Sequence, residues 1–272
     1  AAVYVSGTLE ESIGYVKASN TGADDNFGFA VALARDGNTL AIGSPDEDSA
    51  TTGVGSFPND DASNAGAVYI YTLNEGSWSQ HAYRTAANSG TGDLFGGSGA
   101  IAGDGNTLVV GASSEDSSTT GINSIPNKIG FDSGAVYVFT RSDSIWGQQA
   151  YIKASNSDRG DAFGSSVAIS EDGHTLAVGA LGEDSGTTGV NSEPDDAAPS
   201  AGAAYIFKRD ESTWSQQAYI KASNSDDEDR FGSVVTLSND GNTLAIGSSR
   251  EASSTTGVNS APNNVAAGAG AG

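Results

Sequence analysis

The feature that most constrains this chain is a 68-residue repeat, because four such units account for all 272 residues. Phe-Gly and Asp-Gly pairs recur at this spacing, as do single glycine, proline and tyrosine positions. The repeated positions are Phe27, Phe95, Phe163 and Phe231; Asp36, Asp104, Asp172 and Asp240; Gly53, Gly121, Gly189 and Gly257; Pro58, Pro126, Pro194 and Pro262; and Tyr15, Tyr83, Tyr151 and Tyr219. The period indicates an array of equivalent structural units.

Each unit is predicted to form four short antiparallel strands. In the third unit, residues 163–170 and 175–179 read as two strands, and the Asp172-Gly173 pair between them is a strong hairpin signal. Two more strands are expected near 203–207 and 216–221. No helical period of useful length is found. We therefore expect an all-β, four-bladed β-propeller with four antiparallel strands per blade, forming a single domain over residues 1–272.

The two ends of the chain are expected to build the closing blade together. Three blades are predicted at about 27–86, 95–154 and 163–222, and the fourth unit stops after its second strand. Residues 1–5 and 15–19 resemble the two missing strands, so a blade made from 1–19 plus 231–272 would protect exposed strand edges. Its turn is shorter, since Tyr4 and Tyr15 are 11 positions apart whereas Tyr69 and Tyr83 are 14 apart.

The repeat resembles the FG-GAP repeat of the integrin α-subunit propeller and its bacterial relatives. The resemblance rests on the Phe-Gly pair, the Asp-Gly turn, Leu-Ala-Ile-Gly-Ser-Pro at 40–45 and Gly-Ala-Val-Tyr-Ile-Tyr at 66–71. It implies an extracellular β-propeller used for adhesion or ligand binding, often with bound calcium. Integrin-type propellers have seven blades, and their calcium loop joins strands one and two. Here that connection is a bare hairpin at 35–38, so the family's calcium site is not transferred to this chain.

The negative charge of the chain is concentrated in two classes of loop. The connections between strands two and three, and those from strand four to the next unit, should emerge on the same face. They carry 23 of the 34 acidic residues but only four basic ones, which places −19 of the net charge of −22 on that face. We call it the acidic face. A charge of this sign argues against nucleic acid as a partner.

Two interpretations of the acidic face are open. Asp, Ser, Thr and Asn side chains often hydrogen-bond the backbone of their own turns, which would leave a merely solvated surface. Alternatively, carboxylates, hydroxyls and carbonyls supply the six to eight oxygens that Ca²⁺ prefers. The candidate calcium ligands are Asp25, Asp93, Asp161, Asp229, Asp46, Glu47, Asp48, Glu115, Asp116, Glu183 and Asp184. In the fourth unit the Glu-Asp pair is replaced by Glu251 and Ala252, which predicts a weaker site there.

Residues for catalysis are few. The chain has no Cys, and its two histidines, His81 and His174, are not repeated in the other units. We therefore expect a protein that is not an enzyme. Trp78, Trp146 and Trp214 recur at the repeat spacing and could stack on sugar rings, although a repeated Trp more often packs against its own fold. No apolar segment is long enough for a spanning helix, so membrane insertion is not expected.

Three functions are consistent with the sequence. The first is an extracellular adhesion or ligand-binding module, stabilised by calcium, with a protein or glycan ligand. The second is the structural subunit of a surface filament, in which the N-terminal strands complete the open blade of a neighbouring copy. The third is a carbohydrate-binding, lectin-like propeller. Because the chain begins with Ala1 and contains no Met, we also expect processing from a longer precursor. The resemblance to the FG-GAP family implies an extracellular or cell-surface location.

Overall fold

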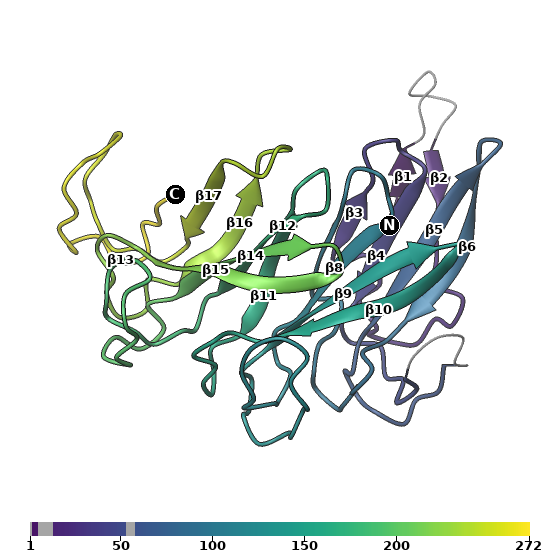
Figure 1. Ribbon diagram of the computed structural model, residues 1–272, viewed down its shortest axis with the longest axis horizontal. Coiled ribbons are helices and arrows are strands. Elements are labelled where there is room, and N and C mark those ends of the chain that lie inside the picture. Colours follow the sequence, from purple (N-terminus) through teal and green to yellow (C-terminus); the bar gives the residue numbers. More distant parts are fainter. Residues whose placement is uncertain (1, 5–12, 53–57) are drawn as a thin grey trace.

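The computed structural model describes residues 2–4, 13–52 and 58–272, and every regular element in this part of the chain is a β-strand. Three sheets of four or five strands stand side by side along an arc (Figure 1). The first contains β3 (Val31–Leu33), β4 (Thr39–Ser44), β5 (Ala67–Asn74) and β6 (Ser77–Arg84). The second contains β7 (Ser98–Ile101), β8 (Thr107–Ala112), β9 (Ala135–Ser142) and β10 (Ile145–Ile152). No described element is a helix that could cross a membrane.

The third sheet repeats this order and adds a short outer strand. It contains β11 (Phe163–Ile169), β12 (Thr175–Ala180), β14 (Ala203–Asp210) and β15 (Thr213–Lys221), with β13 (Gly189–Val190) paired to the outer side of β15. Within each sheet the main neighbours are antiparallel and consecutive in the chain. We call these three sheets the first, second and third blades. They show the strand order that the 68-residue pattern predicts.

Asp-Gly turns join the first two strands of each unit. Gly37, Gly105, Gly173 and Gly241 all have positive φ, a conformation that glycine adopts without steric cost. The preceding aspartate accepts a hydrogen bond from the backbone two residues later, as in Asp104 Oδ1 with the amide of Asn106 at 2.9 Å. This Asx-type bond reinforces the turn and explains why the dipeptide marks the hairpins.

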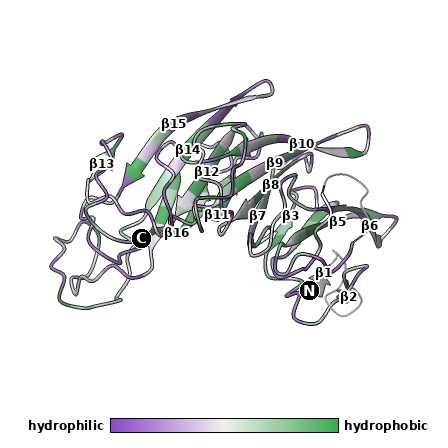
Figure 2. Ribbon diagram, turned by 90° about the horizontal axis from the view of Figure 1, so that it is seen from below, coloured by the Kyte–Doolittle hydropathy of each residue, from purple (hydrophilic) through white to green (hydrophobic). Residues whose placement is uncertain are grey.

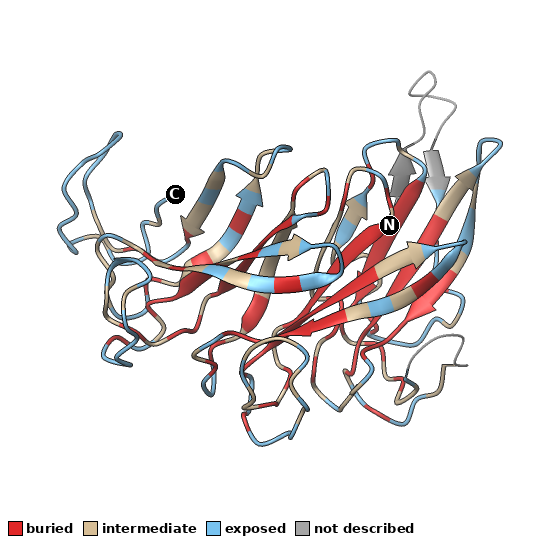
Figure 3. Ribbon diagram, viewed as in Figure 1, coloured by how far each residue is buried: buried red, intermediate tan, exposed pale blue. Residues whose placement is uncertain are grey.

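The core lies between the blades. Strands β4, β8 and β12 are buried along their whole length (Figure 3). Their side chains pack into the clusters between adjacent blades, and those of β4 also pack against Val16 and Ala18. One cluster packs Val68 and Ile70 of the first blade against Leu108 and Val110 of the second. Hydrophobic residues accordingly lie along the inner strands, and polar ones gather at the outer strands and loops (Figure 2).

Glycine allows the blades to approach closely. A Cβ placed on Gly111 would collide with the carbonyl oxygen of Gly164, the second residue of the next Phe-Gly pair. The same relationship holds between Gly43 and Gly96 and between Gly179 and Gly232. Since each contact is backbone against backbone, only glycine fits. The repeated junction fixes one blade on the next.

The ends of the chain form two separate two-stranded sheets. We call β1 (Ala2–Tyr4) with β2 (Ile13–Tyr15) the N-terminal half-blade, and β16 (Phe231–Leu237) with β17 (Leu244–Ser248) the C-terminal half-blade. They lie at opposite ends of the arc (Figure 1). The expected blade from 1–19 plus 231–272 is therefore not assembled within this chain in the structure.

The N-terminal hairpin also has a register different from that of the complete blades. Matching Tyr4 with Tyr69 implies that Tyr4 should face Tyr15, because Tyr69 faces Tyr83 in the first blade. Instead Tyr15 faces Ala2, and Tyr4 faces Ile13. The complete blades carry a bulge in this strand pair, as between Ile70 and Tyr71, whereas the described pairs of the hairpin run without one. The turn residues 5–12 lie outside the described residues.

Candidate functional site

A buried glutamate begins the long loop after the second strand of every unit. Glu47, Glu115, Glu183 and Glu251 are at most 5% exposed. In each case the carboxylate accepts a hydrogen bond from the backbone amide two residues later, as in Glu115 Oε2 with the amide of Ser117 at 3.1 Å. An asparagine from the preceding unit also donates to it, as Asn88 Nδ2 does to Glu115 Oε1 at 2.8 Å. The glutamate thus fastens its own loop to the neighbouring blade.

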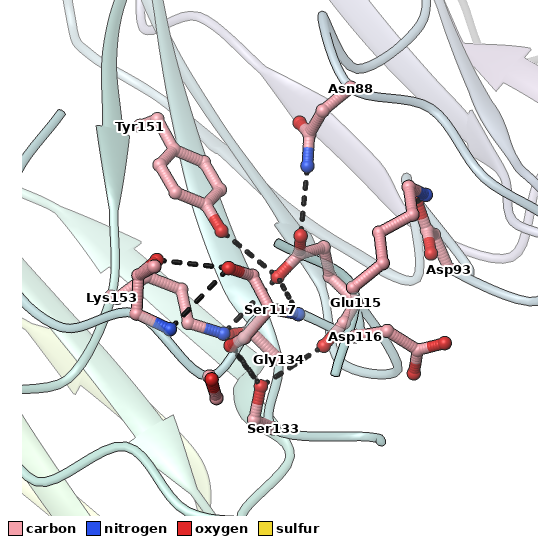
Figure 4. Close-up of polar contacts among 12 residues, drawn as sticks. Asn88, Asp93, Glu115, Asp116, Ser117, Ser133, Gly134, Tyr151 and Lys153 are labelled. Carbon is pink, nitrogen blue, oxygen red and sulfur yellow. Dashed lines mark hydrogen bonds and ion pairs between the residues drawn. The ribbon is translucent and has the colours of Figure 1, made fainter. Parts of the chain in front are cut away.

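In the second and third blades a lysine neutralises this glutamate. Lys153 Nζ lies 3.1 Å from Glu115 Oε2, and it also donates to Ser133 Oγ at 2.7 Å and to the carbonyl of Gly134 at 2.5 Å (Figure 4). The hydroxyl of Tyr151 donates to the same carboxylate at 3.0 Å. Burial lowers the pKa of Lys153, while the attraction of Glu115 opposes that shift. The result is a fully buried, hydrogen-bonded ion pair.

The third blade repeats the arrangement. Lys221 Nζ lies 2.7 Å from Glu183 Oε2 and 2.6 Å from the carbonyl oxygen of Gly202. The Tyr219 hydroxyl donates to Glu183 Oε1 at 2.7 Å, and Asn156 Nδ2 donates to the same oxygen at 2.9 Å. These lysine and asparagine partners are not among the residues predicted from the sequence. The signal was available, because Lys153 and Lys221, and Asn88 and Asn156, are themselves 68 residues apart.

The first blade departs from this pattern. Thr85 occupies the position of the lysine, and its hydroxyl donates to the carbonyl of Thr51 at 2.6 Å. Glu47 is 2% exposed and has hydrogen bonds from Asn20 Nδ2 at 2.7 Å and from the Ser49 amide at 2.9 Å. Burial raises the pKa of Glu47. Among the described residues, no ammonium or guanidinium group forms an ion pair with it.

The aspartate that lies two residues before each Phe-Gly pair is also buried. Asp25, Asp161 and Asp229 each accept a hydrogen bond from the backbone amide three residues earlier, at 2.5, 2.8 and 3.1 Å. Asp93 is 1% exposed, and neither of its carboxylate oxygens has a hydrogen-bond partner among the described residues. Lys128 Nζ lies 3.6 Å from its Oδ2. Burial raises the pKa of Asp93 to about 7 and that of Asp161 to about 8.

The remaining candidate calcium ligands fasten the two ends of the long loops. Asp48, Asp116 and Asp184 accept backbone hydrogen bonds from residues 16 positions later, at 2.8, 3.1 and 2.7 Å. Asp46 accepts side-chain hydrogen bonds from Asn26 and Asn64. These contacts match the solvated-turn interpretation.

The described carboxylates do not form a ready calcium cage. Within residues 2–4, 13–52 and 58–272, no group of three or more His, Cys, Asp or Glu side chains is arranged to hold a metal ion. In the second and third blades the oxygens of the buried glutamate already accept protein hydrogen bonds, including one from a lysine ammonium. Those two clusters therefore do not fit a resident cation. The first blade, which lacks the lysine, offers the better fit.

The repeated tryptophans are mostly buried. Trp146 is 0% exposed and Trp214 is 3% exposed. The guanidinium groups of Arg141 and Arg209 lie over their rings, 5.4 and 5.6 Å from the centroids. The faces that a sugar would need are thus covered by protein, while Trp78 is half-buried. The two histidines, His81 and His174, are also far apart in the fold, on β6 and in the β11–β12 turn.

The two classes of acidic loop touch one another. The amide of Gly92 donates to the carbonyl of Ser63 at 2.9 Å, and the amide of Gly160 donates to that of Phe131 at 3.0 Å. Each pair joins the loop that leaves the fourth strand of a blade to the long loop of the same blade. Exposed carboxylates on these loops include Asp24, Asp60, Asp61, Asp132, Asp158, Glu193, Asp195, Asp196, Asp227 and Glu228.

Comparison with known proteins gives distant structural neighbours. The chain is similar to the β-propeller domain of Myceliophteria thermophila Cps50 (Swd1), at 12% identity and a TM-score of 0.43, covering 80% of this chain and 48% of that one. It is similar to Saccharomyces cerevisiae Sqt1, at 12% identity and a TM-score of 0.44, covering 85% of this chain and 44% of that one. It is also similar to Kuenenia stuttgartiensis hydrazine synthase, at 16% identity and a TM-score of 0.46, covering 86% of this chain and 45% of that one. The chain thus spans less than half the length of each. No curated protein matches it.

The comparison with protein families is more specific. The model of the FG-GAP repeat matches residues 78–139, 146–207 and 214–261, which together are well over half of the chain. The first residues of these segments are the three tryptophans, spaced by the same 68-residue step as the buried glutamates. The protein therefore belongs to the FG-GAP repeat family.

Proposed function

We propose that this chain is a non-enzymatic, extracellular or cell-surface binding module that recognises a protein or glycan ligand through its acidic face. The observation that carries the proposal is the contact between the two classes of acidic loop. The loop that leaves the first or second blade donates backbone hydrogen bonds to the long loop of that blade, and its asparagine donates to the buried glutamate of the next blade. Loops on a rigid scaffold are the usual place for recognition residues. The affinity of such a face for a cationic partner should fall as salt increases.

The ligand chemistry follows from the charge. Glu193, Asp195 and Asp196 are exposed close together on one long loop, so a surface rich in lysine or arginine would be attracted to them. The lectin-like alternative is less well supported, because Trp146 and Trp214 are covered. A protein ligand with a basic patch is therefore the better candidate than a glycan.

A second function, assembly by strand complementation, is favoured by the two half-blades. Each is one half of a four-stranded blade, and together they supply its first two and last two strands. The closing blade of the propeller, expected from 1–19 plus 231–272, would then be a composite of these elements. A structural subunit of a surface filament, or a ring closed between copies, would result.

Calcium enters the proposal at the first blade. Glu47 and Asp25 are buried and have no ion pair among the described residues. Burial raises the pKa of Asp25, and repulsion by Asp48 adds to this, while attraction by Lys17 opposes it. A hard cation would relieve this repulsion, drawing its other oxygens from hydroxyl and carbonyl groups of the loop. Calcium would act there as a stabilising ion and not as a catalyst.

The binding proposal can be tested with immobilised lysine- and arginine-rich peptides, by interferometry over a series of salt concentrations. The variant Glu193→Gln/Asp195→Asn/Asp196→Asn should bind several-fold more weakly. Asn at position 195 is conservative, because Asn59, Asn127 and Asn263 hold the equivalent positions. A matched control is Glu75→Gln/Asp143→Asn/Glu211→Gln, which removes three exposed acids at the turns between third and fourth strands. Equal binding by both variants would refute the role of the acidic face.

A further inference from the structure

The two half-blades have the packing of a blade cut in two. The chain after β2 packs on the first blade, with Val16 and Ala18 in the cluster that contains Tyr69. The Tyr69 hydroxyl donates to Asn20 Oδ1 at 2.7 Å, as the equivalent tyrosines of the next two blades do to Asn88 and Asn156. The N-terminal half-blade therefore occupies the place of the outer strands of a preceding blade.

The ion pair of the complete blades is divided between the two ends. Glu251 is 5% exposed and has hydrogen bonds from Asn224 Nδ2 and the Ser253 amide, but no described lysine reaches it. In the second and third blades the lysine, Lys153 or Lys221, stands at the end of the fourth strand, and the described C-terminal half-blade consists of β16 and β17 alone. Lys17, at the equivalent position of the N-terminal half-blade, is exposed. One end holds a buried carboxylate and the other holds the matching ammonium.

A tyrosine is divided in the same way. Tyr83, Tyr151 and Tyr219 are 9%, 5% and 5% exposed, and the last two donate to the buried glutamate. Tyr15 is the equivalent residue, two positions before Lys17, and is 76% exposed. An aromatic side chain this exposed beside an exposed lysine is what a half-blade without its partner would present.

The C-terminal half-blade carries a formed socket for these residues. A cavity of about 450 Å³ is lined by Glu251, Asn259 and Gly270. In the second blade, Asn123 Oδ1 accepts a hydrogen bond from the backbone amide of Tyr151 at 3.0 Å, and the backbone amide of Asn123 donates to the carbonyl of Tyr151. In the third blade, Asn191 and Tyr219 form the same two bonds, the first at 2.9 Å. Asn259 is the equivalent residue of the C-terminal half-blade. Its φ is 57°, and Asn123 and Asn191 both have a φ of 55°. Gly270 is equivalent to Gly134 and Gly202, whose carbonyls accept the lysine.

A second hollow lies beside the socket. It measures about 380 Å³ and is lined by Val234, Gly247 and Ala271. At the other junctions the glycine equivalent to Gly247 is covered by the carbonyl of the next Phe-Gly pair, whereas here no such backbone lies close. In a continued array the next pair would be Phe27-Gly28, which follows the N-terminal half-blade. Socket and hollow together match that end of the chain.

We propose that the C-terminal half-blade of one molecule is completed by the N-terminal half-blade of a second copy, with Lys17 and Tyr15 of one copy against Glu251 of the other. The inference rests on the proposed assembly function and names its partner. The occupant is a second copy and not the chain's own N-terminus, because the half-blades lie at opposite ends of the arc (Figure 1). Closing the arc within one chain would require the repeated glycine junctions to change together.

Charge reversal tests the pairing in the full chain. Lys17→Glu and Glu251→Lys, each alone, should abolish the concentration-dependent increase in mass measured by sedimentation velocity. Mixing the two variants should restore assembly, because residue 17 of each variant then meets a residue 251 of opposite charge on the other variant. Misfolded variants could not be rescued in this way. Arg159→Glu and Glu75→Lys, at exposed positions elsewhere, should assemble like the wild type.

Three results would overturn the inference. The first is a wild type that remains monomeric at every concentration. The second is a mixture that stays monomeric. The third is that the effect of charge reversal is compensated only when both substitutions are made in the same chain, Lys17→Glu/Glu251→Lys, and that this double variant is a monomer. That result would indicate closure within one chain. Peptide binding by the acidic face, measured on the same samples, separates the proposals, since a monomer that still binds would refute assembly and leave the binding function intact.

Discussion

Lys153 Nζ lies 3.1 Å from Glu115 Oε2, and both side chains are fully buried. The pair costs desolvation energy, but its hydrogen bonds to Ser133, Gly134, Tyr151 and the loop backbone satisfy the buried charges. Figure 4 shows that these groups converge from three segments of the second blade. The pair therefore ties the outer strand β10 to the long acidic loop.

Removing one partner of this pair should be strongly destabilising. We expect Lys153→Met to lower the free energy of unfolding by about 3–5 kcal/mol, because it leaves an uncompensated buried carboxylate. Urea denaturation followed by fluorescence measures the change. Arg250→Met is the matched control, since Arg250 and Glu228 form an ion pair that is more than half exposed and should contribute about 1 kcal/mol or less. A similar small loss in both variants would contradict the structural role of the buried pair.

The blades were predictable because their signals are local. The Asp-Gly turn and the alternating strands of one unit specify its hairpins, and the 68-residue step multiplies them. The path of the arc depends on backbone contacts such as that of Gly111 with Gly164, which the sequence does not reveal. The sequence left open whether the two ends pair within one chain or between chains, and the described strands of the two ends do not pair within this chain. The acidic loops lie between the strands where the sequence placed them, but the partner of Glu115 was missed because Lys153 directly follows strand β10 and carries the opposite charge.

The buried aspartates should make stability depend on pH. Burial raises the pKa of Asp93 from 3.8 to about 7, so between these values the native state holds a proton that the unfolded chain has lost. Stability should therefore fall as the pH rises through this window, by about 4 kcal/mol at most for a shift of three units. Asp93→Asn, which stays neutral, should flatten this dependence and be more stable than the wild type at pH 8.

Chemical denaturation at a series of pH values measures the effect. Asp60→Asn, on the same face but exposed, is the control and should follow the wild type. Parallel profiles for the wild type and Asp93→Asn would show that Asp93 is not the group responsible. Asp161→Asn should behave like Asp93→Asn, because burial raises the pKa of Asp161 to about 8.

Calcium dependence should be confined to the first blade. Excess Ca²⁺ should raise the thermal midpoint of the wild type relative to a chelator, since a ligand bound to the native state stabilises it. Thr85→Lys would give Glu47 the ammonium that Glu115 and Glu183 already have, and should abolish the calcium effect. Scanning calorimetry with and without calcium makes the comparison. An unchanged midpoint in the wild type, or an equal shift in the variant, would rule out this site.

The glycine junctions should tolerate no side chain. Gly111→Ala places a Cβ against the carbonyl of Gly164 and the hydroxyl of Ser98, so the second and third blades would have to separate. We expect a loss of about 1–3 kcal/mol, typical of overpacking in a close-packed interior. Gly147→Ala is the control, because a Cβ there meets nothing within 4 Å, and it should change stability by about 0.5 kcal/mol or less. If both variants unfold at the same urea concentration, the close approach of the blades does not limit stability.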